Sequence, residues 1–91
     1  MRFAWDSNKN RRNRRVHGID FADAARIFEG STYEVVDDRE DYGEDRFSLL
    51  GLYQGVVLYV AYTERGDNIR IISARRAERH EQDRYYRQNA P

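Results

Sequence analysis

The chain has 91 residues, with 16 basic and 16 acidic side chains and no cysteine. A chain this short has interior for one hydrophobic core, so we expect a single domain over residues 1–91 with a loose tail at 88–91. The lack of cysteine excludes disulfides, iron–sulfur clusters and zinc–thiolate sites, and the zero net charge argues against a generic nucleic-acid binder. No apolar run is long enough for a signal peptide or a membrane span, so we expect a cytoplasmic protein without membrane contact.

The first third of the chain predicts one short strand and two helices. Residues 2–5 alternate polar and apolar side chains, as a strand does. A helix then runs to Gly18 with Asp6 or Ser7 as its cap, but it has no large apolar residue between Ser7 and Arg15 and must be short, tethered or frayed. Asp20 caps a second helix, whose apolar residues have helical spacing: Phe21, Ala24, Ala25 and Phe28.

The middle of the chain predicts strands over residues 32–36, 47–53, 56–63 and 69–74. Gln54-Gly55 and Gly66-Asp67 are typical of tight hairpins, which make the last three strands an antiparallel meander. One face of the meander is apolar, and we expect the helices to cover it. The other face should be a half-open cleft with polar residues: Arg46, Ser48, Tyr59, Thr63 and Arg70.

A polar helix over residues 77–86 completes the pattern. The expected fold is therefore α+β, with the order β-α-α-β-β-β-β-α and an antiparallel sheet whose helices pack on one face.

Charge is unevenly distributed along the chain. Residues 1–18 carry six cations and one acid, whereas residues 34–45 carry seven acids and one arginine. Most cations are arginine, whose planar fork binds phosphate or carboxylate, so RNA and an acidic protein both suit this preference. We expect the acidic stretch 37–45 to be a solvated loop; docking on a basic partner or shielding of the arginine cleft are the alternatives.

The sequence predicts neither a metal site nor a cofactor. His17 and His80 lie far apart without a paired ligand, and the acidic stretch lacks the ligand spacing of a calcium loop. No glycine-rich loop is present to cradle phosphates. The chemistry left to consider is the cleavage of RNA without a metal. It requires a base for the 2′-hydroxyl, an acid for the leaving oxygen and cations around the phosphate.

Several arginines can supply those cations. Arg70, Arg75 and Arg76 lie at the last strand, with Arg46 across the sheet; the alternative is that they lie over the sheet and pair with acidic residues. The base stays open between two residues. Glu64 stands at a hairpin end, where an ordinary exposed glutamate is the alternative, and His17 precedes Gly18, where an imidazole also caps carbonyls.

Short motifs along the chain together resemble the BrnT toxins. They are Trp5-Asp6, His17-Gly18, Thr63-Glu64-Arg65-Gly66 and Arg70-Ile71-Ile72-Ser73-Ala74-Arg75, within a resemblance that runs from Phe3 to about Tyr85. The resemblance implies a RelE-like toxin fold and a metal-independent endoribonuclease that inhibits translation by cutting RNA. It also implies a BrnA-type antitoxin, which binds DNA through a ribbon-helix-helix module and forms a hetero-oligomer with the toxin.

The resemblance also suggests site residues by position. Together with the reasoning above, the expected catalytic residues are Arg70, Arg75, Arg76, Glu64 and His17. The expected RNA-binding residues are Lys9, Arg46, Thr63 and Arg65. The alternative function is a non-enzymatic regulatory subunit that binds RNA or protein through the same arginine surface.

Overall fold

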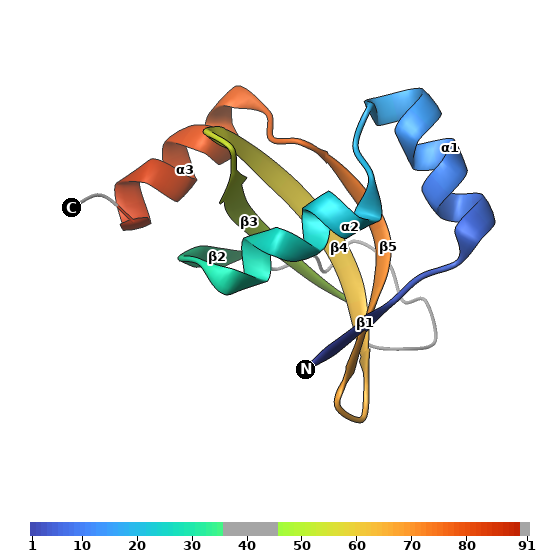
Figure 1. The fold of residues 1–91 in the computed structure, drawn as a ribbon. Helices are drawn as coiled ribbons and strands as arrows, with labels where there is room; N and C mark the ends of the chain where they lie inside the picture. The colour runs from blue at the N-terminus through green and yellow to red at the C-terminus, as the bar shows by residue number, and fades with distance from the viewer. Residues whose placement is uncertain (36–45, 90–91) are drawn as a thin grey trace.

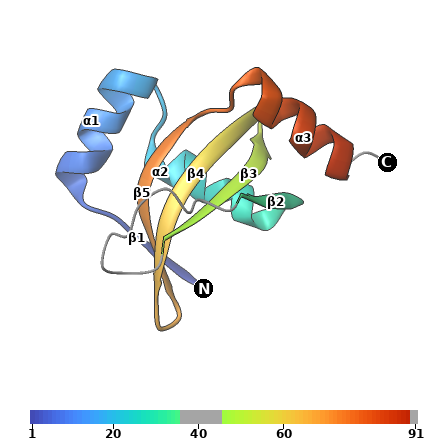
Figure 2. The same ribbon diagram turned by 180° about the vertical axis from the view of Figure 1, so that it is seen from behind.

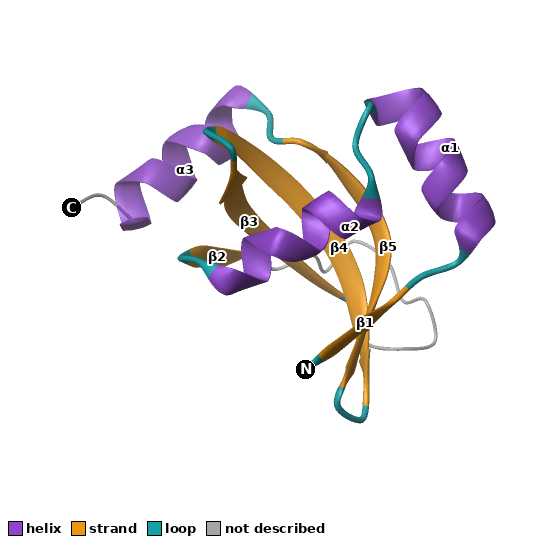
Figure 3. Cartoon of the chain, in the orientation of Figure 1, coloured by secondary structure: helices purple, strands orange, loops and turns teal. Residues whose placement is uncertain are grey.

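The computed structural model describes residues 1–35 and 46–89, so the acidic stretch predicted at 37–45 lies outside it. The elements are β1 (Arg2–Ala4), α1 (Ser7–His17), α2 (Phe21–Ala24), the 3-10 helix η1 (Ala25–Glu29), β2 (Thr32–Val35), β3 (Phe47–Tyr53), β4 (Val56–Arg65), β5 (Asn68–Arg76) and α3 (Arg79–Asn89). The α+β class is confirmed (Figure 3). Because α3 runs to Asn89, residues 88 and 89 are helical and do not belong to a loose tail.

The five strands form one sheet in the order β1-β5-β4-β3-β2 (Figure 1). Strands β2, β3, β4 and β5 pair antiparallel with one another, and Phe47 lies opposite Tyr62 as the hairpin turns predict. The expectation of a wholly antiparallel sheet is wrong at β1, which pairs parallel with β5. Parallel neighbours need a long crossover, and the helices and strands between β1 and β5 supply it.

The first face of the sheet, on the side of Phe47 and Tyr62, carries the larger core. The second helix packs here as α2 and η1, with buried Phe21, Ala24 and Ile27 against the strands. Gly51 of β3 permits this close packing, since a Cβ atom at this position would lie 2.7 Å from the Cβ atom of Ile27. The predicted apolar face is therefore the one that α2 and η1 cover.

The second face of the sheet, on the side of Leu50 and Tyr59, carries a smaller core under α3 (Figure 2). Buried Leu50 and Val57 contact Ala77 and Tyr85, and the Tyr85 hydroxyl donates to the Ser31 carbonyl at 3.0 Å. The prediction that all helices pack on one face is wrong for α3. The apolar run through β4 places large side chains on both faces, and the second set needs its own cover.

Helix α1 is attached to the edge of β5 by buried asparagine, not by an apolar stripe. Asn13 donates to the carbonyls of Ile19 and Ala74 at 2.9 and 2.8 Å and accepts from the Ala74 N–H at 3.2 Å. Strand β1 ends opposite Arg70, so the backbone of Ala74 would otherwise lie at an open sheet edge. The predicted tethering of this helix is confirmed, and Asn13 is the tether.

Candidate functional site

A β-bulge in β5 determines which arginines share a face. Tyr62 pairs with Ile71 and Ala61 with Ser73, so Ile72 is an extra residue. Thr63 therefore lies beside Arg70, and Tyr59 beside Arg75. Tyr59 and Thr63 are four residues apart on one strand and share a face, so Arg70, Ser73 and Arg75 all lie on the second face. Without the bulge, Arg70 and Arg75 would lie on opposite faces.

Arg75 is held in place by three neighbours. Its guanidinium donates to the backbone carbonyl of Arg76 at 3.2 Å. Glu81 of α3 accepts from both terminal nitrogens of its guanidinium, at 2.8 and 3.0 Å, and the group lies 4.1 Å from the centre of the Tyr59 ring. The hydrogen bond to Glu81 raises the pKa of Arg75. Burial would raise the pKa of Glu81, but hydrogen bonds from Arg75 and from the Glu78 N–H outweigh it and lower this pKa. Arg75 remains 31% exposed, so its orientation is fixed while part of it stays accessible.

Arg70 and Thr63 differ from Arg75 in having no such partners. Arg70 is half-buried, and its side chain forms no hydrogen bond or ion pair with the described part of the chain. Thr63 is 1% exposed, and its hydroxyl finds no hydrogen-bond partner among the described residues. Arg46 precedes β3, is half-buried and is already engaged in an interaction. Arg70 is thus a half-buried cation without a counter-charge in the described structure, beside an unsatisfied hydroxyl.

A groove of about 310 Å³ separates α1 from β5 and contains two of the predicted residues, Lys9 and His17. The structure adds Arg12 from α1 and Ser73 from the bulged part of β5 to the same groove. Lys9, Arg12 and Val16 have the i, i+3, i+7 spacing of one helix face, so the sequence contained a signal that these side chains lie together. The run of basic residues hid this signal, because α1 has cations on every face. The groove face can be identified only once Asn13 is known to be the buried residue.

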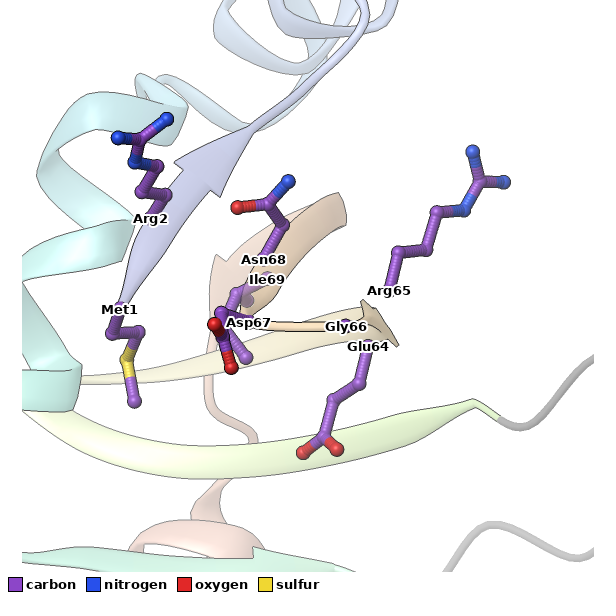
Figure 4. Close-up of a pocket in the computed structure, with 8 residues that line it drawn as sticks. All are labelled: Met1, Arg2, Glu64, Arg65, Gly66, Asp67, Asn68 and Ile69. Carbon is purple, nitrogen blue, oxygen red and sulfur yellow. The ribbon is translucent and has the colours of Figure 1, made fainter.

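Glu64 and Arg65 lie apart from this groove. They occupy the β4–β5 hairpin end, in an open hollow of about 780 Å³ that also involves Met1, Arg2 and residues 66–69 (Figure 4). Their side chains point to different sides of the hairpin, and Glu64 is exposed and pairs with Ile69 on the first face. The structure therefore does not bring Glu64 into the groove that contains His17.

Arg76 also lies away from Arg70 and Arg75. It pairs with Leu58 on the first face, is exposed, and lines a small hollow of about 180 Å³ with Ile19, Asp23 and Tyr53 among others. Adjacent residues on a strand point to opposite faces, so Arg75 and Arg76 cannot hold one phosphate from the same side. The predicted catalytic arginines are thus divided between the two faces.

Two further observations concern the described residues only. No group of three histidine, cysteine, aspartate or glutamate side chains in residues 1–35 and 46–89 is arranged to hold a metal ion. None of the helices in these two segments is long and apolar enough to cross a membrane.

Comparisons with known proteins agree with the α+β fold. The family model described as "Ribonuclease toxin, BrnT, of type II toxin-antitoxin system" matches residues 5–81. The crystal structure of the ribonuclease toxin BrnT from Brucella abortus superposes with a TM-score of 0.71 and 28% sequence identity, covering 87% of this chain and 99% of that chain. No curated protein matches the sequence.

Proposed function

This chain belongs to the BrnT family of ribonuclease toxins of type II toxin–antitoxin systems, and from this premise we propose a more specific function. The protein is a metal-independent endoribonuclease that inhibits translation. Membership of the family implies an RNA substrate and an antitoxin partner. The metal-independent step uses the 2′-hydroxyl of RNA itself as nucleophile, so the protein need not activate a water molecule. The reaction then requires one base, one acid and stabilisation of the negative charge on the phosphate oxygens.

The observation that carries the proposal is that Arg70 and Arg75 share the second face with Ser73, which also lines the groove of α1. In the proposed reaction, the His17 imidazole accepts the 2′-hydroxyl proton, the 2′-oxygen bonds to phosphorus, and the bond to the 5′-oxygen breaks. A protonated group or water gives the departing oxygen its proton. Arg70 and Lys9 neutralise the negative charge on the non-bridging oxygens of the phosphate, and Arg12 is a further cation in the groove.

The remaining predicted residues receive smaller roles in this scheme. Arg75 is a phosphate contact oriented by Glu81, and Arg46 extends the RNA-binding surface. Thr63 is buried beside Arg70, so it supports this surface from within the sheet and does not contact RNA. Arg65 contacts RNA from the hairpin end. Glu64 stays the competing candidate for the base, and Arg76 has no part in the chemistry proposed here because it lies on the first face.

The antitoxin is proposed to be of the BrnA type, with a ribbon-helix-helix module that binds DNA while a second segment covers the toxin. The family description supports an antitoxin. The cationic groove supports an acidic contact in that segment, because opposite charges across an interface favour rapid and specific association.

The test is incubation of the purified protein with RNA in the presence of a chelator. The proposal expects fragments that end in a 2′,3′-cyclic phosphate or a 3′-phosphate, and it expects Arg70→Ala to lose them while Arg84→Ala, an exposed arginine of α3, keeps them. Binding of RNA without cleavage would favour the alternative, a regulatory subunit that binds RNA or protein. Cleavage that appears only when a divalent cation is added would contradict metal independence.

A further inference from the structure

Helix α1 carries cations on the side that faces away from the groove. Arg11 and Arg15 are one turn apart and exposed, and neither forms an ion pair with the described residues. Arg14 differs from them, since it reaches Asp20 at 3.4 Å. Lys9 and Arg12 line the groove on the other side. The helix is therefore cationic both toward the sheet and away from it.

Repulsion among these cations opposes the stability of α1, although Arg15 lies in the last turn, where a cation interacts favourably with the helix dipole. Like charges at i, i+4 on a helix each cost about 0.2–0.5 kcal/mol, and α1 has no acidic residue to offset them. A surface that serves solubility alone normally mixes both signs. The helix buries only Asn13, so it is attached by hydrogen bonds that hold a repulsive set of arginines at the sheet edge. Such an arrangement indicates an anionic partner for the outer side.

We propose that Arg11 and Arg15 bind the phosphates of single-stranded RNA that flanks the cut site. The proposal rests on the proposed function, because the strand would pass from the groove over α1. A helix of eleven residues is about 16 Å long, enough to follow several phosphates of one strand. The chain has zero net charge, so an affinity located at α1 reflects this helix and not a general cationic attraction.

Continuity with the groove favours RNA over an acidic protein as the occupant. Lys9 and Arg12 already lie where the proposed cut takes place, and Arg11 and Arg15 extend the same cationic surface on the same helix. The arginine fork also matches phosphate oxygens that recur along a strand. An antitoxin bound through these two arginines is the competing outcome of the test below.

The test measures how salt affects the binding of a single-stranded RNA whose 2′-hydroxyls are methylated, so that it cannot be cut. Each phosphate contact on a single strand contributes about 0.7 to the slope of log K against log salt, so the double variant Arg11→Ala with Arg15→Ala should reduce the slope by about 1.4. Alanine favours helix, so circular dichroism of the variant should match wild type. The control is Arg84→Ala with Arg87→Ala on α3. Both arginines are exposed and form no ion pair with the described residues, so the slope should stay unchanged.

An unchanged slope in the Arg11 and Arg15 variant, or an equal loss in the control, overturns the inference. So does a variant that loses affinity for the antitoxin but keeps the wild-type slope for RNA. A separate assay tests the proposed function: wild-type protein is incubated with unmodified RNA in chelator. If the RNA stays intact, the proposed function fails. Binding of methylated RNA does not depend on cleavage.

Discussion

The Glu81 carboxylate joins β5 to α3 by accepting from two nitrogens of Arg75, at 2.8 and 3.0 Å, and from the Glu78 backbone N–H at 2.7 Å. The last contact resembles half of a capping box, in which a glutamate in the first helical turn reaches back to the residue before the helix. One buried carboxylate thus begins the helix and orients the arginine.

Replacement of Glu81 by alanine should destabilise the protein. We expect a loss of about 2–3 kcal/mol in the free energy of unfolding, since hydrogen bonds to charged groups contribute about 1.5–3 kcal/mol. Urea denaturation measures this. Asp83→Ala removes an exposed acid from the same helix and should change the value by less than about 0.5 kcal/mol. Equal effects of the two substitutions would mean that the contact with Arg75 contributes little.

Acid should weaken the fold through the same carboxylate. The pKa of Glu81 is lowered in the folded state, so its contribution is complete above the pKa of the unfolded carboxylate and is lost as pH falls through the folded pKa. Stability should therefore decline between about pH 5 and 3, and less steeply in Glu81→Gln. Asp20 adds to the decline, because the Ala22 N–H and other neighbours lower its pKa too. If the stability of wild type and of Glu81→Gln declines identically as pH falls, the Glu81 carboxylate is not the group responsible.

The tether of α1 should be sensitive to Asn13. Asn13→Ala leaves the N–H and carbonyl of Ala74 without partners, and unsatisfied buried groups cost about 1–3 kcal/mol each, so we expect a loss of about 2–4 kcal/mol. Hydrogen exchange of the Ala74 amide should accelerate more than exchange in β4. Asn8→Ala is the matched control on the exposed side of α1. Retained protection of Ala74 would show that another group covers this edge.

The register of the meander was predictable from the sequence, whereas the location of the site was not. Two-residue hairpins fix Phe47 opposite Tyr62 by local geometry alone. Ile71-Ile72-Ser73 is an unbroken strand pattern, and nothing in it shows that Ile72 is the extra residue that moves Arg75 to the face of Arg70. The partner of Arg75 follows a strand end and a turn, so Glu81 is recognised only once α3 is placed.

Among the glycines that the structure describes, Gly51 is the one where an added Cβ atom meets a neighbour within 3 Å. In Gly51→Ala the new Cβ atom would meet the Cβ atom of Ile27 at 2.7 Å, so η1 must shift away from β3. Overpacking of this kind costs about 1–3 kcal/mol. Gly30→Ala is the control, because a Cβ atom there has no neighbour within 4 Å and the backbone φ is −115°. A Gly51→Ala protein as stable as Gly30→Ala would show that η1 adjusts freely.

Loss of the Arg70 guanidinium should reduce cleavage without unfolding the protein. Arg70 has no partner in the described structure, so its removal breaks no internal hydrogen bond. Removal of one group that stabilises charge in the transition state costs about 10²–10³ in kcat. Arg70→Lys should recover part of this loss, since a lysine keeps the charge but not the fork. If folded Arg70→Ala cleaves RNA at the wild-type rate, Arg70 has no role in the reaction.

Substitution of the two candidate bases separates them directly. A positioned base contributes about 10²–10⁴ to the rate, so His17→Ala should lose cleavage by that factor while Glu64→Gln stays near wild type. The reason is location: His17 lines the groove with Lys9 and Ser73, whereas Glu64 lies at the hairpin end, outside that groove. His80→Ala, an exposed histidine on α3, controls for histidine loss in general. The reverse pattern, with Glu64→Gln inactive and His17→Ala active, would move the reaction to the hairpin end and leave the groove as an RNA-binding surface only.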